Sequence, residues 1–195
     1  LVKGASKGEG LGNQFLGNIR ECHAIIHVLR CFDNDNIVHV DGSVNPIRDK
    51  ETIDIELQLK DLETVEKRLD KVTRAAKAGD KVAQKELALL GRYREALLKG
   101  ISARAVELSE EEQELSQSYQ LLTAKPILYV CNVDEASAAT GNKYVEAVRE
   151  AVKNENAQVI VLAVATEADI AELETYEERQ LFLQDMGLDE PGASV

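Results

Sequence analysis

Four consecutive residues in the second half of the chain have groups that could recognise a ligand. The segment "PILYVCNVDE", residues 126–135, is an apolar run that stops at Asn132 and continues with Val133, Asp134 and Glu135. An amide side chain can tether a neighbouring loop, and a carboxylate can accept hydrogen bonds from the edge of a nucleotide base. The same residues also suit a plain polar turn after a buried strand. The tetrapeptide alone leaves both interpretations open.

The elements around this segment predict where its side chains would lie. The apolar patterns predict a strand over 126–131, a helix near 142–155 and a second strand over 158–164, with further helices behind it. Strands that alternate with helices indicate a parallel sheet covered by helices. Ligands bind such sheets beyond the carboxyl ends of the strands. Asn132 and the loop 163–167 would therefore lie side by side if their strands are neighbours.

The first part of the chain predicts a loop, a helix and another strand. Residues 1–18 contain five glycines, which is typical of a flexible or sharply turned loop that leads into a helix. Residues 23–32, "HAIIHVLRCF", are expected to form a fully buried strand, and residues 33–45 a polar loop. His23 and His27 lie four residues apart on that strand, where core positions are favoured over a metal site.

From residue 46 to 100 the chain is charged, rich in helix-forming residues and almost free of helix breakers. Apolar residues recur at steps of three and four, which predicts two long helices, and Gly79-Asp80 separates them. A tight turn there makes an antiparallel coiled-coil hairpin. Its expected seam consists of Ile55, Leu59, Leu62, Val65, Leu69, Val72, Ala76, Ala83, Leu87, Leu90, Tyr93 and Leu97. Ser109 and Glu112 then fit a capping box at the start of another helix.

The charge of the hairpin differs from that of the whole chain. The chain has a net charge of −12, which argues against wholesale binding of nucleic acid or membrane. Residues 60–104 nevertheless contain 12 Lys or Arg and 7 Asp or Glu, a net charge of +5. A basic arm could contact RNA phosphates, or it could be a solvated coiled coil with internal ion pairs. The cations towards its tip, our candidate RNA-binding residues, are Lys67, Lys71, Arg74, Lys77, Lys81 and Lys85.

Cysteine content and hydropathy indicate the compartment. Cys22, Cys31 and Cys131 lie in or beside apolar runs without zinc spacing, so we expect buried, reduced thiols in a cytoplasmic protein. No apolar run approaches the length of a membrane span, and no signal-peptide pattern is present. A membrane partner is not expected.

The stretch "GASKGEGLGNQFLGNIRECHAIIHVLRCFDNDNIVHVDGSVNPIRD" closely resembles the YchF/Obg-like ATPase family of P-loop NTPases. The glycine-rich run, the "RCF" strand end, "DNDNIVHV", the Asn-x-x-Glu loop, the helical insertion and "EADIAEL" match in order, over essentially all 195 residues. The resemblance implies an α/β fold: part of a P-loop NTPase (G) domain with a parallel sheet, interrupted by the hairpin. Residues 1–45 and 123–195 would form the G-domain part, and 46–122 the helical insertion.

The resemblance also implies a nucleotide site. Its expected residues are Asn132, Val133, Glu135, Ala163, Val164 and Ala165. Asn132 and the backbone of Val133 would border an adenine, and the Asn-x-x-Glu variant accompanies acceptance of ATP, often over GTP. The extra methylene of Glu135 displaces the carboxylate that would otherwise read guanine. Ala163 stands at a loop position where Ser is common in GTP-binding proteins, so it would contribute through its backbone amide.

Parts of the family pattern do not occur in this sequence. The P-loop, G-x-x-x-x-G-K-[ST], is absent, and with it the amides and the Lys that would hold phosphates. We therefore expect the chain to be a fragment, with Mg²⁺ needed only with ATP or GTP in the whole protein. Leu1 would stand where classical GTPases carry the Gln that orients water. Gly8 to Gly12 would be the mobile switch II; a plain loop is the alternative, and a Rossmann fingerprint has the wrong spacing.

The sequence thus predicts a nucleotide-binding and nucleotide-hydrolysing switch protein associated with the ribosome or RNA. The whole protein would be an ATPase or GTPase, and this chain alone would be inactive. The alternative is a non-enzymatic helical module that binds the ribosome or RNA. Sequence-specific binding of DNA is not expected.

Overall fold

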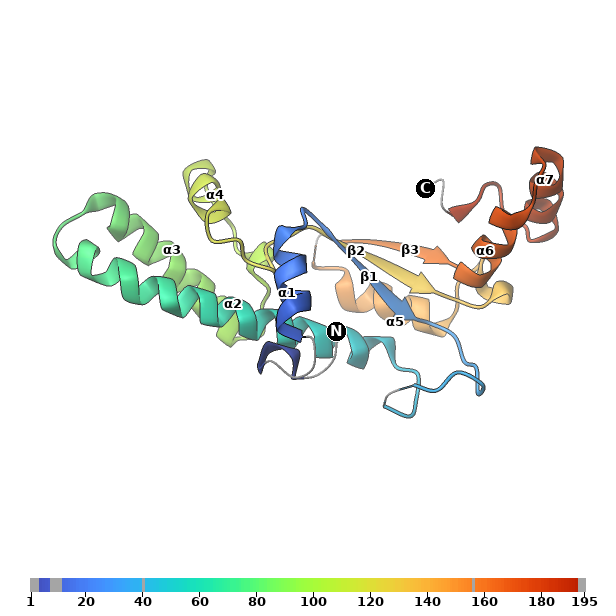
Figure 1. Cartoon of the computed structure of the whole chain (residues 1–195), viewed down its shortest axis with the longest axis horizontal. Helices are drawn as coiled ribbons and strands as arrows, with labels where there is room; N and C mark the ends of the chain where they lie inside the picture. The colour runs from blue at the N-terminus through green and yellow to red at the C-terminus, as the bar shows by residue number, and fades with distance from the viewer. Residues whose placement is uncertain (1–3, 8–11, 40, 156, 193–195) are drawn as a thin grey trace. The chain divides into compact units, whose positions relative to one another are not determined.

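The computed structural model describes residues 4–7, 12–39, 41–155 and 157–192 (Figure 1). Its elements in chain order are the 3-10 turn η1 (Ala5–Lys7), α1 (Gly12–Glu21), β1 (Ile25–Arg30), α2 (Pro46–Lys77), α3 (Lys81–Leu98), the turn η2 (Ala103–Ala105), α4 (Glu110–Gln117), β2 (Ile127–Asn132), the turn η3 (Glu135–Ser137), α5 (Lys143–Val152), β3 (Gln158–Leu162), α6 (Val164–Glu172) and α7 (Tyr176–Asp185). The predicted order of strands and helices is confirmed.

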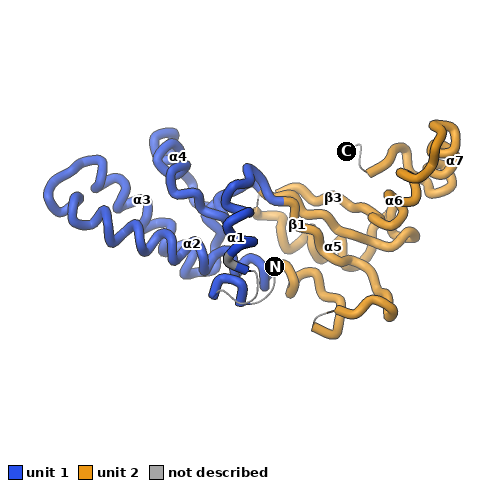
Figure 2. Tube along the Cα trace, viewed as in Figure 1, with its two compact units in different colours: residues 1–25, 51–126 blue, residues 26–50, 127–195 orange. Residues whose placement is uncertain are grey.

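The chain divides into two compact units (Figure 2). Unit 1 comprises residues 1–25 and 51–126, and unit 2 comprises residues 26–50 and 127–195. The predicted domain limits, with residues 46–122 as an insertion, remain a prediction.

Unit 2 contains a parallel three-stranded sheet in the order β1-β2-β3. β2 and β3 pair from Leu128 opposite Gln158 to Asn132 opposite Leu162. At the end of β1, the amide of Cys31 donates to the carbonyl of Asn132 over 2.7 Å. The parallel α/β fold expected from the sequence is confirmed, and the carboxyl ends of β2 and β3 lie next to each other.

Helix α5 buries a regular apolar stripe in unit 2. Val145, Val148 and Val152 are almost fully buried, at the spacing of three and four that places side chains on one helix face. Beyond its end, Glu155 accepts a hydrogen bond from the hydroxyl of Tyr129 on β2 (2.8 Å). These contacts fix α5 and the following turn to the strand that leads to Asn132.

Strand β1 departs from the prediction of full burial over residues 23–32. Its side chains alternate, with Leu29 buried but Ile26 and Val28 exposed by 66% and 57%. A strand buries side chains on both sides only where both faces of its sheet are covered. Within the described part of the chain, one face of β1 has no covering element. His23 lies before the strand and is exposed, whereas His27 is half-buried against the ring of Tyr129.

Helices α2 and α3 form the predicted antiparallel hairpin in unit 1. Gly79 turns the chain with φ +95°, a conformation that favours glycine, and Asp80 caps α3 by accepting from the amides of Val82 and Ala83. A core of apolar residues from both helices and the segment behind them holds the hairpin. Its buried members are Val65, Leu89, Leu90, Tyr93, Leu97, Ala103, Tyr119 and Leu121.

The predicted seam is wrong at the start of α2. Ile55 and Leu59 are exposed by 52% and 44%, and Leu87 on α3 is only partly buried. Leu57 is buried instead, in a second cluster with Leu16 of α1 and Leu122. The buried face of α2 therefore changes along its length, because its first turns pack against α1 rather than against α3.

Two acidic residues on this inner part of α2 bind backbone amides. The carboxylate of Glu56 accepts from the amides of Gly4 (2.6 Å) and Ser6 (2.8 Å). That of Asp61, which is fully buried, accepts from the amides of Leu122 and Thr123, each over 2.7 Å. These bonds replace water around the charge and hold two distant segments on the helix.

The remaining helix and cysteine predictions have mixed outcomes. The capping box of Ser109 and Glu112 is confirmed, and a second one starts α7. Cys31 and Cys131 are buried, but Cys22 is exposed, contrary to the prediction. Among the described residues, no helix has both the length and the apolar character that a membrane span requires.

Candidate functional site

The loops after β2 and β3 are tied together by one side chain. The Oδ1 atom of Asn132, the last residue of β2, accepts a hydrogen bond from the amide of Val164 over 3.1 Å. The amide of Val133 donates to the carbonyl of Leu162 over 2.9 Å, which extends the ladder by one residue. The predicted side-by-side arrangement of the two loops is therefore present in the structure.

The backbone of Val133 is less available than the sequence suggested. Its side chain is 3% exposed, and its amide already donates to β3. A contribution of this residue to ligand binding would have to come from its carbonyl oxygen. On the facing loop, Ala163 is buried and stands at the N-cap of α6 without a side-chain cap, while Val164 is 44% exposed.

The two acids that follow Val133 have different surroundings. Asp134 caps the turn η3, because its Oδ1 accepts from the amide of Ser137 over 3.1 Å. Glu135 is the first residue of that turn and is exposed. Both interpretations of the tetrapeptide thus have a structural counterpart: Asp134 makes the polar turn, and Asn132 makes the tether.

Asn142 contributes to this site and was not singled out in the sequence. Its Oδ1 caps α5 by accepting from the amides of Tyr144 and Val145, while its Nδ2 donates to the carbonyl of Cys31 over 2.7 Å. The residue thereby fixes the end of β1 to the start of α5. The sequence could have identified Asn142 as an N-cap, because it follows Gly141 and directly precedes an amphipathic helix, and Asn is favoured at that position.

The loop after β1 is organised by the last residue of that strand. The guanidinium of Arg30 donates to three backbone carbonyls, those of Phe32, Asn34 and Ile37. Such an arrangement uses the fixed fork of an Arg to shape an otherwise polar, irregular segment.

Two thiols lie beneath these loops. Cys31 and Cys131 are both fully buried, at the ends of adjacent strands. A hydrogen bond with the Cys131 thiol and burial together raise the pKa of the Cys31 thiol, so it stays protonated at neutral pH. A buried thiol of this kind is a packing residue rather than a nucleophile.

One group of potential metal ligands occurs among the described residues, namely His39, Asp41 and Asp49. His39 Nε2 lies 2.8 Å from Asp49 Oδ2, and the guanidinium of Arg48 pairs with both carboxylates, 3.0 Å from Asp49 and 3.7 Å from Asp41. The Arg already supplies the positive charge that a cation would bring. This cluster is therefore a poor metal site.

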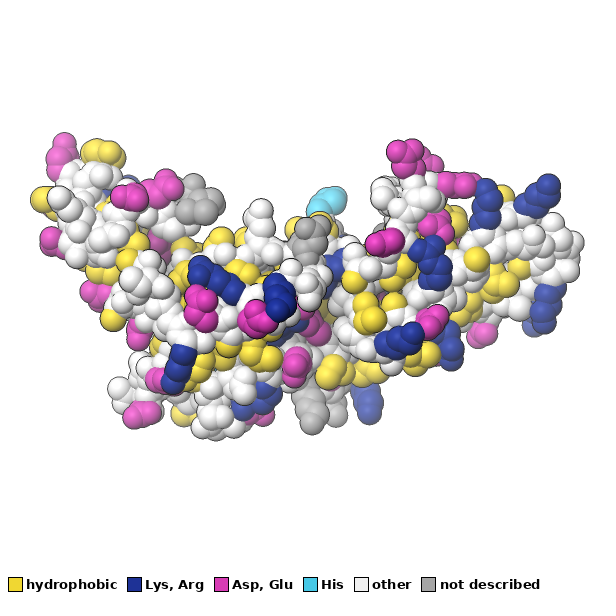
Figure 3. All heavy atoms as spheres, turned by 180° about the vertical axis from the view of Figure 1, so that it is seen from behind, with side chains coloured by type: hydrophobic (Ala, Val, Ile, Leu, Met, Phe, Trp, Pro, Cys, Tyr) yellow, Lys and Arg dark blue, Asp and Glu magenta, His cyan; other side chains and the backbone are white. Residues whose placement is uncertain are grey.

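The six candidate RNA-binding residues of the arm separate into two groups. Lys67 pairs with Glu63, and Lys85 pairs with Glu111 over 2.6 Å. The other four, which are exposed and form no ion pair within the described part of the chain, are Lys71, Arg74, Lys77 and Lys81. Figure 3 shows Lys and Arg side chains spread over this arm.

Two predictions fall outside the described residues. Leu1, at the position of a water-orienting Gln, is one of them, and residues 8–11 of the expected switch II segment are the other. Gly12, which is described, begins α1, where its Cα lies so close to Ala5 that a Cβ would be 2.6 Å from the Ala5 Cα.

No protein-family model matches the chain. The comparison with solved structures, however, agrees with this geometry. A solved structure, that of the Schizosaccharomyces pombe YchF GTPase, superimposes with a TM-score of 0.81 at 33% identity, covering 93% of this chain and 50% of that one. The chain therefore has an α/β fold that matches the G-domain-like fold of this YchF protein.

Sequence similarity makes the relationship more specific. The ribosome-binding ATPase YchF of Bacillus subtilis is 52% identical over 194 residues, and that of Escherichia coli O157:H7 is 51% identical over 192. Either alignment covers 98% of this chain, but 53% and 52% of the relative. The chain is thus homologous to the YchF ATPases along nearly its whole length, and it spans about half the length of these relatives.

Proposed function

We propose that these residues form the base-recognition part of a ribosome-associated protein that binds and hydrolyses ATP or GTP. The observation that carries the proposal is the bond from the Val164 amide to Asn132 Oδ1, which joins the two strand-end loops. A site at the carboxyl ends of parallel strands is where this class of fold binds ligands. The names of the homologues, ribosome-binding ATPases and a GTPase, support the same proposal.

Each site residue has a distinct role in this proposal. With Oδ1 occupied by Val164, the Nδ2 atom of Asn132 is left to donate to a ring nitrogen of the base. The carbonyl of Val133 would accept from the base, and the exposed Glu135 would limit the match to guanine. Ala163, Val164 and Ala165 would line the opposite side, next to the amino end of α6.

The phosphates would be bound by other parts of the whole protein. The P-loop pattern does not occur in the 195 residues, so the amides and Lys that hold phosphates are not supplied by this chain. Mg²⁺ would accompany the phosphates there. We therefore expect the chain alone to hydrolyse neither ATP nor GTP at a useful rate. Turnover equal to that of a whole homologue, in a preparation free of contaminating ATPase, would contradict this.

The decisive experiment replaces Asn132 by Ala in a protein that contains these residues together with a P-loop. Loss of the tether and of the base contact should weaken binding of ATP, measured by calorimetry, by about tenfold or more. The matched control is Asn154→Ala, at an exposed Asn in a turn of the same unit. Equal affinities of both variants and the unmodified protein would exclude Asn132 from the nucleotide site.

A second candidate function belongs to a different class. Four cations near the tip of the hairpin, which form no ion pair with any described residue, favour a helical module that binds ribosomal RNA without any catalysis. Titration of the 195-residue chain with nucleotide and with structured RNA separates the two functions. Both can also coexist in one ribosome-associated protein, which would then be cytoplasmic.

A further inference from the structure

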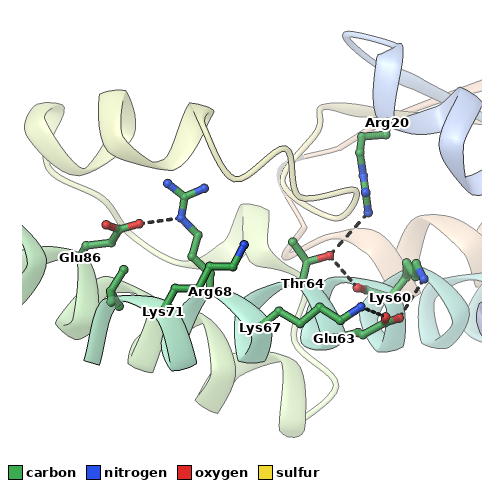
Figure 4. A pocket seen from close by; sticks show the side chains of 9 residues that line it. Arg20, Lys60, Glu63, Thr64, Lys67, Arg68, Lys71 and Glu86 are labelled. Carbon is green, nitrogen blue, oxygen red and sulfur yellow. Dashed lines mark hydrogen bonds and ion pairs between the residues drawn. The ribbon is translucent and has the colours of Figure 1, made fainter. Parts of the chain in front are cut away.

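Unit 1 contains a pocket that shares Lys67 and Lys71 with the candidate RNA-binding residues, whereas Arg74, Lys77, Lys81 and Lys85 lie outside it. Its volume is about 500 Å³, and its walls come from α1, α2 and α3. The lining side chains are those of Arg20, Lys60, Glu63, Thr64, Lys67, Arg68, Lys71, Val72 and Glu86. Figure 4 shows Arg20 reaching towards Thr64 from one side, opposite the lysines of α2.

The charges of the pocket do not balance. Five cations and two carboxylates line the pocket, which leaves three positive charges in excess among the lining side chains, while the buried Asp61 also attracts Arg20. Glu63 is shared, because Lys60 donates to it over 2.8 Å and Lys67 also binds it. Hydrogen bonds from Lys60 and Lys67 lower the pKa of Glu63 to about 2, so this carboxylate is negatively charged at neutral pH. Lys71 forms no ion pair within the described part of the chain.

Two of the cations are held in place by neighbouring side chains. The guanidinium of Arg68 lies 4.4 Å from the centre of the Tyr119 ring, donates to Glu86 over 2.6 Å, and donates to the carbonyl and hydroxyl oxygens of Ser118. Arg20 makes one long bond, 3.5 Å from Nη2 to Thr64 Oγ1, and its Nε is buried with no acceptor among the described residues. A buried donor without a partner is unfavourable, and an anion in the pocket would satisfy it.

The shape and lining indicate the chemical class of such an anion. The cations come from α1, which supplies Arg20, and from α2, which supplies the other four. Such a combination suits phosphate, because its oxygens can accept paired hydrogen bonds from a guanidinium and single ones from an ammonium group. None of the described residues that line the pocket is aromatic, so they offer a nucleobase no ring on which to stack. The volume lies within the range of small-molecule sites, roughly 300–1,000 Å³. A compact ligand rich in phosphate fits these features better than an RNA strand.

We propose that this pocket binds a small anion with two or three linked phosphate groups, of the pyrophosphate or tripolyphosphate type. The proposal is independent of nucleotide hydrolysis, and the cations closest to the tip of the hairpin, Arg74, Lys77 and Lys81, are not part of the pocket. It is specific to unit 1, whereas the base-recognition loops lie in unit 2.

The test is calorimetric titration of the 195-residue chain with inorganic pyrophosphate and with tripolyphosphate. Arg20→Gln and Lys71→Ala should each weaken binding by about tenfold, the usual effect of losing one charge-assisted contact. Lys77→Ala, on the same helix but outside the pocket, is the matched control and should bind like the unmodified chain. Asn132→Ala should also leave binding unchanged, which keeps this test separate from that of the proposed nucleotide site.

A second measurement does not depend on any variant. Because the Nε proton of Arg20 is the unpartnered donor, its NMR resonance should move on addition of pyrophosphate and stay in place with AMP, which has one phosphate. Several results would overturn the proposal: no saturable binding of either polyphosphate, an equal effect of Lys77→Ala and Arg20→Gln, or tighter binding of AMP. Binding of an RNA oligonucleotide that depends on Arg20, without binding of pyrophosphate, would show an RNA surface instead and would also overturn it.

Discussion

The strand ends of unit 2 and the helical arm of unit 1 achieve order by different means. At the strand ends, single polar side chains bind backbone groups: Asn132 holds the next loop, and Asn142 holds both α5 and the end of β1. In the arm, a row of apolar residues such as Val65 and Leu90 packs between two helices. The first arrangement fixes the position of a few atoms, whereas the second fixes a length of helix and leaves its outer face free.

This difference determines what each region can do. A site that distinguishes one base from another needs a few donors and acceptors in fixed positions, and in our proposal the tethered loops would provide them. A surface that contacts a phosphate backbone needs charge rather than exact geometry, and the unpaired cations of the arm provide it. A third case is found within unit 1, where the buried carboxylate of Asp61 on α2 accepts hydrogen bonds from the backbone amides of Leu122 and Thr123.

The largest effect is expected from reversing charge at the tip of the arm. Changing Arg74, Lys77 and Lys81 to Glu should nearly abolish binding of ribosomes or structured RNA, because each lost phosphate contact also removes its counterion release. Helix content should not change, since all three side chains are exposed. The measurement is a titration at two salt concentrations, with circular dichroism of the variant.

The matched control reverses three cations of the arm that are already paired, namely Arg92, Arg94 and Lys99. Their ion pairs with Glu112, Glu66 and Glu95 are exposed and contribute little to stability. If this control weakens binding as much as the tip variant, the effect is one of net charge, and the tip is no specific surface. Binding that does not depend on salt would argue against RNA contact altogether.

The next effect concerns the buried acid of α2. Asp61→Ala should lower the free energy of unfolding by about 3 kcal/mol or more, because the amides of Leu122 and Thr123 lose their acceptor in a dry site. Asp70→Ala, at an exposed Asp on the same helix, should change it by less than about 0.5 kcal/mol. Urea unfolding followed by circular dichroism measures both. Similar values for the two variants would show that Asp61 does not anchor the 121–123 segment.

A smaller, related effect is expected in the pH dependence of stability. Burial raises the pKa of Asp61 above its ordinary value of 3.8, although the donated hydrogen bonds oppose this. Because the pKa is higher in the folded state, the contribution of this group is complete below about pH 3.8 and is lost as the pH rises through the folded-state pKa. The stability difference between the unmodified chain and Asp61→Ala should therefore shrink from acid to neutral pH. A difference that grows instead would mean that the pKa is lowered.

The sequence predicted the elements of this fold well, because each had a strong local pattern. The Gly79-Asp80 break, the capping box at Ser109 and the stop at Asn132 fell where the structure has them. The antiparallel hairpin followed from the steps of three and four, which depend on neighbouring turns of helix alone. The proximity of the two strand-end loops followed from parallel pairing, a rule of the fold.

Most of the errors involve contacts between segments far apart in the sequence. Ile55 and Leu59 continued the apolar spacing, yet they are exposed, because that part of α2 turns Leu57 and Asp61 towards α1 and the 121–123 segment. Ile26 and Val28 looked buried because an apolar run does not show whether both faces of its sheet are covered. The pairing of Asn142 with Cys31, 111 positions away in the chain, has no local pattern at all.

The smallest expected effect tests how the tethered loops choose between bases. In a protein that contains these residues with a P-loop, Glu135→Asp should shift the ratio of ATP to GTP affinity towards GTP, because the shorter acid approaches a guanine edge differently. The shift should be partial, about two- to fivefold and below the roughly tenfold effect of a full charge-assisted contact. Asp134→Asn, which keeps an Oδ1 acceptor for the Ser137 amide, is the control. An unchanged ratio in Glu135→Asp would show that backbone groups such as the Val133 carbonyl set the preference, and that the exposed carboxylate has no part in it.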